Sequence, residues 1–93
     1  MSDTRRATVK IVNKLGLHAR PAMMFVDTAN RFSADITVRR GDQEELVDGK
    51  SIMQLMMLAA TQGTVLEITA SGERAQDAID ELVALVKSSF SEE

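Results

Sequence analysis

The chain has 93 residues, of which 44% are hydrophobic and 27% are charged, and its formal net charge is −3. These proportions are typical of one soluble globular domain. The negative charge argues against nonspecific nucleic-acid binding, and the lack of cysteine excludes disulfides and thiolate metal sites. The longest apolar run, Leu55 to Ala60, is far shorter than a membrane span, and the charged first residues do not look like a secretory signal. We therefore expect a cytoplasmic protein with no membrane or nucleic-acid partner.

The first half of the chain alternates between strand and helix patterns. Apolar residues at every second position predict a strand over residues 7–11, and a loop follows in which Gly16 is free to take an unusual backbone conformation. A helix is predicted from Ala19 to about residue 30. Its apolar face consists of residues three or four positions apart: Ala22, Phe25, Val26 and Ala29. Two further strands are predicted around residues 36–38 and 46–47, with a turn at 41–42 between them.

The second half begins with a helix signal at Ser51, whose hydroxyl can cap the free amides of the turn that it starts. The apolar face predicted for this second helix consists of Ile52, Leu55, Met56 and Ala59. Residues 62–64 are expected to end it. Alternation predicts a fourth strand over residues 66–70, and a last helix is predicted from about Ala75. Its apolar stripe consists of Ala78, Ile79, Leu82 and Val86.

The predicted order of elements is β-α-β-β-α-β-α. Strands with one apolar and one polar face indicate an antiparallel sheet that is covered on one side only. We therefore predict an α+β fold, a two-layer open-faced β-sandwich with a four-stranded antiparallel sheet and three helices on one face.

The only histidine, His18, lies where the first helix is predicted to start. Imidazole changes charge near physiological pH, and its neutral form carries a nucleophilic nitrogen. A helix start exposes unpaired amides and the positive end of the helix dipole, so a phosphoryl group placed there meets several donors. Arg20 adds a forked cation, and Pro21 suits a first helical turn. This combination is suited to holding a phosphoryl group.

Other roles for His18 must be weighed against this one. A single histidine near a helix start is most often an exposed or hydrogen-bonded residue without a catalytic role. A metal site would need further ligands, and the chain has no second histidine and no cysteine. Ser33 and Asp27 are present, but no spacing ties them to His18 as a triad. The residues alone leave the structural role and the phosphoryl site open.

Two segments carry a resemblance to a known family. Gly16-Leu17-His18-Ala19-Arg20-Pro21-Ala22 resembles the phosphorylation-site signature of the histidine-containing phosphocarrier proteins (HPr) of the bacterial sugar phosphotransferase system. Gly49-Lys50-Ser51-Ile52-Met53 is similar to the regulatory-serine segment of the same family. The order of elements and the length agree as well. The resemblance extends roughly over residues 5–87 and implies one HPr-like phosphocarrier domain over residues 1–93.

The resemblance implies a stoichiometric carrier, not an enzyme, and no cofactor. His18 would accept a phosphoryl group from phosphorylated enzyme I, which draws it from phosphoenolpyruvate, and would pass it to enzyme IIA domains. Arg20 would steady the phosphoryl oxygens, and the backbone amides of Ala19 and Ala22 would hold them. A monomer is expected.

Ser51 follows a Gly-Lys pair, which invites comparison with a nucleotide-binding P-loop. That motif needs a glycine at position 44, where this chain has Glu44, so we exclude it. From the residues alone Ser51 is a helix N-cap. The resemblance adds that it is similar to the target of a bifunctional HPr kinase/phosphorylase, with a transcriptional regulator as a further partner.

The second helix has more apolar residues than one buried stripe needs. Met53 and Met57 form a second stripe, which either completes a core poor in aromatics or is exposed as an adaptable docking surface. The resemblance favours docking, because the corresponding segment and the loop before the histidine form the shared partner surface. The candidates for this surface are Leu17, Met23, Met24, Ile52, Met53 and Met57.

Three functions compete at this stage. The first is the general sugar-system phosphocarrier, and the second is a regulatory paralogue of a nitrogen-type or carbon-control branch that acts mainly by protein binding. The third is an RNA- or peptide-binding module on the open sheet, which would display aromatic residues on its strands. The three aromatics fall on or next to predicted helices: Phe25, Phe32 and Phe90. We rank the third function last.

Family members often have small residues where Gln54 and Met57 stand, and many carry lysines where Asp27 and Asn30 stand, so the identity of the partners stays open.

Overall fold

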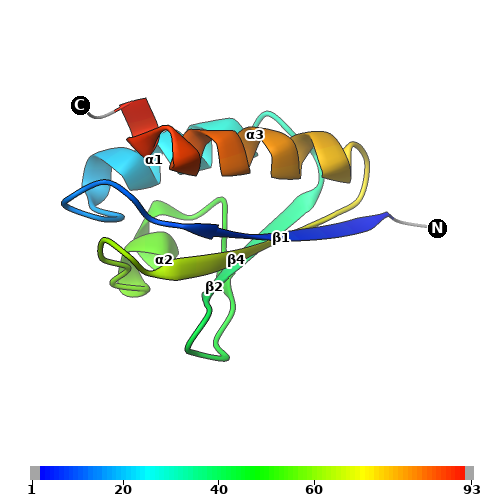
Figure 1. Ribbon diagram of the computed structural model, residues 1–93. Helices are drawn as coiled ribbons and strands as arrows, with labels where there is room; N and C mark the ends of the chain where they lie inside the picture. The colour runs from blue at the N-terminus through cyan, green and yellow to red at the C-terminus, as the bar shows by residue number, and fades with distance from the viewer. Residues whose placement is uncertain (1–2, 92–93) are drawn as a thin grey trace.

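The order of elements is the one predicted from the sequence. The computed structural model describes residues 3–91. Its elements are β1 (Thr4–Lys10), α1 (Ala19–Ala29), β2 (Asp35–Arg40), β3 (Val47–Asp48), α2 (Ile52–Met57), β4 (Val65–Ser71), α3 (Ala75–Lys87) and a short 3₁₀ turn, η1 (Ser89–Ser91) (Figure 1). None of the helices among residues 3–91 has the length and apolarity that a bilayer crossing requires.

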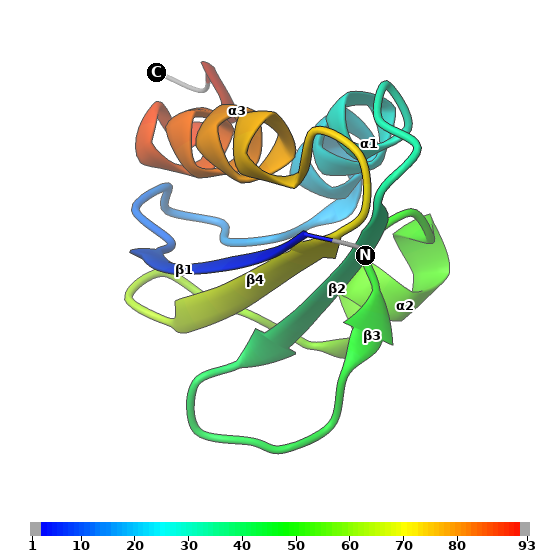
Figure 2. The same cartoon turned by 90° about the vertical axis from the view of Figure 1, so that its right-hand side faces the viewer.

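The four strands form one antiparallel sheet in the order β1-β4-β2-β3. The last strand in sequence, β4, lies in the interior of the sheet, where Leu66 pairs with Val9 of β1 and Ala70 pairs with Ile36 of β2. Both views show α1 and α3 side by side over one face of this sheet (Figures 1 and 2). The helix α2 packs against α1 and β3. The predicted α+β open-faced sandwich is confirmed.

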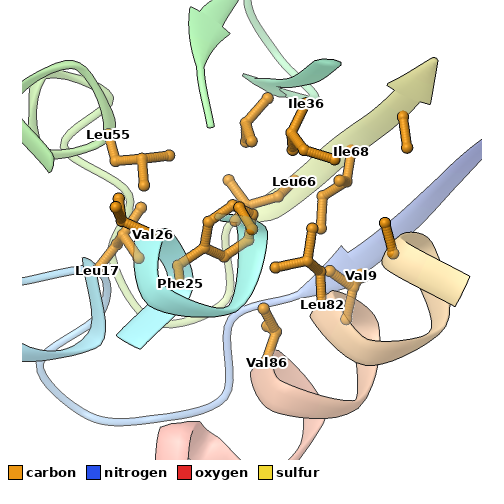
Figure 3. Close-up of a cluster of buried hydrophobic side chains, with 14 of the residues drawn as sticks. Val9, Leu17, Phe25, Val26, Ile36, Leu55, Leu66, Ile68, Leu82 and Val86 are labelled. Atoms are coloured by element: carbon orange, nitrogen blue, oxygen red, sulfur yellow. The ribbon is translucent and has the colours of Figure 1, made fainter. Parts of the chain in front are cut away.

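Alternation along β4 separates the two faces of the sheet. Leu66 and Ile68 are fully buried beneath the helices, whereas Glu67 between them lies on the open face. Phe25 of α1 and Leu82 of α3 complete this core (Figure 3). Burying one such side chain contributes about 1.5–3 kcal/mol, so the shared core fixes α1 firmly on the sheet.

The short strand β3 is only partly as predicted. Val47 is buried and pairs with Val38 of β2. Leu46, predicted as part of this strand, precedes it and is 58% exposed. The strand is therefore an edge element with a single inward side chain.

The helix α2 is shorter than predicted. It ends at Met57 rather than near residue 62, because Leu58 caps it and Ala59 takes a left-handed conformation (φ 52°). A residue with positive φ cannot continue a right-handed helix. The predicted start of α2 is therefore correct, and its predicted end is wrong.

The predicted inward face of α2 is mostly wrong for the same reason. Of its members only Leu55 is buried, and three are exposed: Ile52, Met56 and Ala59. Leu58 and Ala60, which follow the helix, take the other inward places. Once the helix stops after Met57, the spacing of three and four residues no longer decides which side chain faces the core.

Candidate functional site

His18 is the N-cap residue of α1, as its position before Ala19 predicted. Its backbone is extended (φ −84°, ψ −170°), and its side chain is half-buried and makes no capping hydrogen bond to α1 within the described residues. The imidazole is therefore placed at the end of the helix where backbone amides face outward.

The loop before His18 is fixed by contacts to the chain that follows α2. The N–H of Leu17 donates to the carbonyl oxygen of Ala60 at 2.8 Å. Gly16 has φ 70°, and a Cβ at this position would collide with that same carbonyl oxygen. The side-chain Nδ2 of Asn13 also donates to the carbonyl oxygen of Gly16 at 2.8 Å. Only glycine allows this close approach, which sets where α1 begins.

The first turn of α1 presents two amides, but not the two that were predicted. Within the described part of the chain, the N–H groups of Ala19 and Arg20 have no backbone acceptor, as expected of the first helical positions. The N–H of Ala22 donates to the carbonyl oxygen of His18 at 2.9 Å. The predicted role of the Ala22 amide is therefore wrong, because this residue is far enough into the helix to close its first hydrogen bond.

Arg20 is exposed in the same first turn, two residues after His18. Among the charged groups of residues 3–91, no carboxylate forms an ion pair with it. Pro21 is buried beside it and has no N–H to lose. The turn thus combines an imidazole, two amides and a guanidinium that can reach an anion.

Ser51 is the N-cap of α2, as predicted, and its hydroxyl accepts from the N–H of Gln54 at 3.2 Å. The side-chain oxygen of Gln54 in turn accepts from the N–H of Asp48 at 2.8 Å. The Asp48 carboxylate accepts from the N–H of Lys50 at 2.9 Å. This arrangement resembles a capping box, and it holds the half-buried Ser51 in one conformation at the helix start.

The predicted docking residues divide into exposed and buried groups. Met53 is 78% exposed, Met57 is 72% exposed and Met23 is 51% exposed. The prediction is wrong for Leu17, which is only 5% exposed and lies in the core with Val26 and Leu55 (Figure 3). Its apolar side chain is needed to hold the loop and is not available at the surface.

The two remaining candidates differ in exposure. Ile52 is 37% exposed, and Met24 is half-buried against the core. Met24 is also the one described methionine that packs against the core. The alternative in which Met53 and Met57 complete the core is therefore wrong.

Two exposed apolar residues close to these candidates were not predicted to be exposed. Leu15, which is 72% exposed, had a signal in the sequence, because it stands between Lys14 and Gly16 in a predicted loop. Met56, which is 44% exposed, had none, because it matched the buried face of a longer helix. We use the name apolar rim for six large exposed apolar side chains, one in the turn before His18, one on α1 and four on α2; its members are Leu15, Met23, Ile52, Met53, Met56 and Met57.

A surface hollow of about 640 Å³ lies elsewhere, between the turn after β2 and residues 62–65. Its one cation, Arg40, forms an ion pair with Asp42 and donates to the carbonyl oxygen of Leu58. The Arg40 guanidinium of this hollow therefore already has its hydrogen-bond partners within the protein.

The open face of the sheet carries an ion pair. Arg39 donates to the Glu67 carboxylate at 2.7 Å, and this hydrogen bond lowers the pKa of Glu67. In the described residues 3–91, no group of three or more histidine, aspartate or glutamate side chains could hold a metal ion.

Comparisons with known proteins find relatives over most of the length of this chain. Residues 5–88 match the family model described as the PTS HPr component phosphorylation site. The phosphocarrier protein HPr of Pseudomonas putida is 50% identical over 84 residues, which cover 90% of this chain and 92% of that protein. The phosphocarrier protein NPr of Proteus mirabilis is 39% identical over the full length of both chains.

Solved structures are similar as well. The crystal structure of HPr from Thermoanaerobacter tengcongensis has a TM-score of 0.89 and 45% identity, covering 96% of this chain and 98% of that one. A second structure, described as an HPr dimer from the same organism, has a TM-score of 0.74, also with 45% identity, and covers 92% and 97%.

Proposed function

Because the chain belongs to the HPr family of phosphocarrier proteins of the phosphotransferase system, we propose that His18 is its phosphoacceptor. The observation that carries this proposal is the first turn of α1, where an imidazole at the N-cap stands beside two outward amides and the exposed Arg20. Each of these groups favours a negatively charged phosphoryl group at the same point.

The reaction is a transfer between two proteins. A neutral ring nitrogen of His18 attacks the phosphorus carried by phosphorylated enzyme I, and a new N–P bond forms as the bond between phosphorus and its donor atom breaks. The electron pair of the broken bond stays on enzyme I. In the second transfer, to an enzyme IIA histidine, the N–P bond at His18 breaks and the ring regains its lone pair. His18 is regenerated, so the protein acts as a carrier and not as a catalyst.

The helix start lowers the barrier through charges that are already in place. Charge on the phosphoryl oxygens meets the amides of Ala19 and Arg20 and the guanidinium of Arg20 without reorganisation of solvent. The same donors stabilise the phosphohistidine between the two transfers.

The partners would dock over the apolar rim. Exposed methionines make adaptable contacts, which suits a surface that must accept enzyme I and several IIA domains in turn. The rim lies on the same two helices as His18 and Ser51. We propose that the protein acts as a cytoplasmic monomer, and light scattering of the purified chain tests its oligomeric state.

Ser51 is proposed as a regulatory phosphorylation site for an HPr kinase/phosphorylase, with a transcriptional regulator as a reader. A phosphate at an N-cap meets the positive end of its helix, so the fold would tolerate it. Its effect would fall on docking, because a dianion beside Ile52 and Met53 costs desolvation when an apolar partner surface closes over it.

A regulatory paralogue is the second candidate, since relatives named NPr match the whole chain. The higher identity to HPr of Pseudomonas putida favours the general carrier. In both candidate functions His18 becomes phosphorylated. They differ in whether a sugar-specific IIA domain then receives the phosphoryl group.

One assay tests the proposal. The purified protein is incubated with phosphoenolpyruvate and enzyme I, and we expect an acid-labile, base-stable phosphate on His18. Equal incorporation in His18→Ala would remove His18 from this role. A subsequent chase with IIA domains separates the two candidates, because only the general carrier passes the group to a sugar-specific domain.

A further inference from the structure

The apolar rim is unusual in its chemistry, because four of its six members are methionines. The chain contains no cysteine, so the thioethers of methionine are its only sulfur atoms. A thioether is oxidised by peroxides to a sulfoxide, which turns a flexible apolar side chain into a polar one. Four of the six methionines of the sequence therefore belong to the rim.

The methionines of the rim are more exposed to solvent than Met24. Met53 and Met57 are 78% and 72% exposed, whereas Met24 is half-buried against the core. An oxidant in solution reaches the first two directly, and susceptibility follows exposure. Met53 and Met57 are one helical turn apart in α2, so their side chains are neighbours on its surface.

The fold does not depend on these two side chains. Leu55 is the only buried residue of α2, and it faces the core between α1 and the sheet. The N-terminal cap of α2 involves Ser51 and Gln54, not the methionines. An added oxygen on Met53 or Met57 would therefore project into solvent and leave the packing unchanged.

We propose that Met53 and Met57 form an oxidation-sensitive modification site that controls docking of enzyme I; this inference rests on the proposed function. The thioether sulfur attacks one oxygen of hydrogen peroxide, an S–O bond forms and the O–O bond breaks. The hydroxide that leaves takes up a proton and becomes water. Sulfur loses two electrons, peroxide gains them, and methionine sulfoxide is the product.

The consequence follows from burial at the interface. In the unmodified protein the two thioethers lose water when enzyme I docks, which favours binding. A sulfoxide carries a strong acceptor, and an apolar partner surface offers it no donor, so burial becomes unfavourable. The transfer chemistry at His18 is unaltered, because His18 and Arg20 contain no sulfur. Oxidation should therefore raise the KM for transfer from enzyme I and leave kcat unchanged.

The test treats the full chain with hydrogen peroxide, maps oxygen incorporation by peptide mass spectrometry and measures transfer from enzyme I. We expect Met53 and Met57 to be oxidised before Met24, and KM to rise about tenfold, equivalent to ~1.4 kcal/mol. The thermal unfolding midpoint should not move. Treatment with the two methionine sulfoxide reductases, one for each epimer, should restore the original KM.

Two variants serve as matched controls. The double variant Met53→Leu/Met57→Leu should lose most of the peroxide effect on its KM, since leucine has no sulfur and the two remaining rim methionines, Met23 and Met56, are less exposed. The variant Met24→Leu should remain fully sensitive. A peroxide effect of the same size in the double variant, an unchanged KM in the oxidised wild type, or a lowered unfolding midpoint would each overturn the proposal. A protein that accepts no phosphoryl group before treatment would instead refute the proposed function.

Discussion

The first turn of α1 and the first turn of α2 both begin after an extended N-cap residue, His18 in one helix and Ser51 in the other. Ser51 accepts the N–H of Gln54, so its side chain satisfies part of its own helix start. The amides of Ala19 and Arg20 in α1 have no backbone acceptor within residues 3–91. The positive N-terminal end of α2 is therefore capped by a side chain, whereas that of α1 presents its amides to the outside.

On the proposed function, this difference would let one small fold carry two kinds of phosphate chemistry. A capped helix start is stable by itself, and a phosphate added there changes the surface rather than the helix. A helix start with outward amides has donors free for a phosphoryl group, which the proposed function would bring there and remove again. The length of the helices fits this division, since α1 is anchored by five buried residues and α2 by one.

The largest effect is expected from His18→Ala, which should abolish phosphorylation by enzyme I because no other histidine exists. The core does not include His18, so the far-UV circular dichroism should remain that of the folded protein. Incorporation of labelled phosphate from enzyme I is measured in His18→Ala and in Ser51→Ala. Only His18→Ala should lose it. Acid-labile phosphate retained in His18→Ala would break the comparison.

Gly16→Ala should destabilise the protein and slow transfer. A left-handed alanine costs roughly 1–2 kcal/mol, and its Cβ would also push against the Ala60 carbonyl that positions the loop. Gly63→Ala is the matched control, because Gly63 has φ 92° but no atom within 4 Å of an added Cβ. Urea unfolding should show a larger loss for Gly16→Ala than for Gly63→Ala, and an equal loss would argue against the close contact.

Arg20→Ala should slow transfer from enzyme I about tenfold, equivalent to ~1.4 kcal/mol of barrier. The exposed side chain makes no ion pair within residues 3–91, so the unfolding midpoint should stay the same. Arg20→Lys should recover part of the rate, since lysine keeps the charge but not the fork. Measuring kcat/KM for the three proteins checks this, and an unchanged rate in Arg20→Ala would remove Arg20 from the site.

Ser51→Ala should reduce the free energy of unfolding by about 1 kcal/mol through loss of the cap. Ser51→Asp should lose little stability, because aspartate is also a good N-cap, while its charge weakens docking of enzyme I. Unfolding curves and the KM for transfer distinguish these effects. Loss of stability in Ser51→Asp equal to that in Ser51→Ala would mean that the cap geometry admits only the hydroxyl.

The smallest effect is expected far from both helix starts, at the ion pair of the open sheet face. The hydrogen bond from Arg39 lowers the pKa of Glu67 in the folded protein. The resulting stability is present at neutral pH and is lost as the pH falls through that lowered pKa. Glu67→Gln should therefore be slightly less stable than wild type at about pH 7, and this difference should shrink at about pH 3. Urea unfolding at both values tests this, and transfer from enzyme I should not change.

Much of the fold could be predicted because its signals are local. Alternation in β4 and the spacing of Ala78, Leu82 and Val86 in α3 identified both elements with nearly correct bounds. The N-caps at His18 and Ser51 were also predictable, since capping depends on neighbouring residues. The end of α2 could not be predicted in this way. Ala59 is left-handed because the chain must turn there so that the carbonyl oxygen of Ala60 can accept the N–H of Leu17.

The sequence by itself determined the order of the elements, the position of the single histidine at a helix start and the lack of thiol chemistry, because these depend on residue type and short spacing. Tertiary structure decided which apolar side chains remain outside. Leu17 is drawn into the core and Met56 is left at the surface, against the pattern of each segment. The physical reason is that burial depends on how α1, α2 and the loop before His18 fill one shared volume, which no single segment encodes.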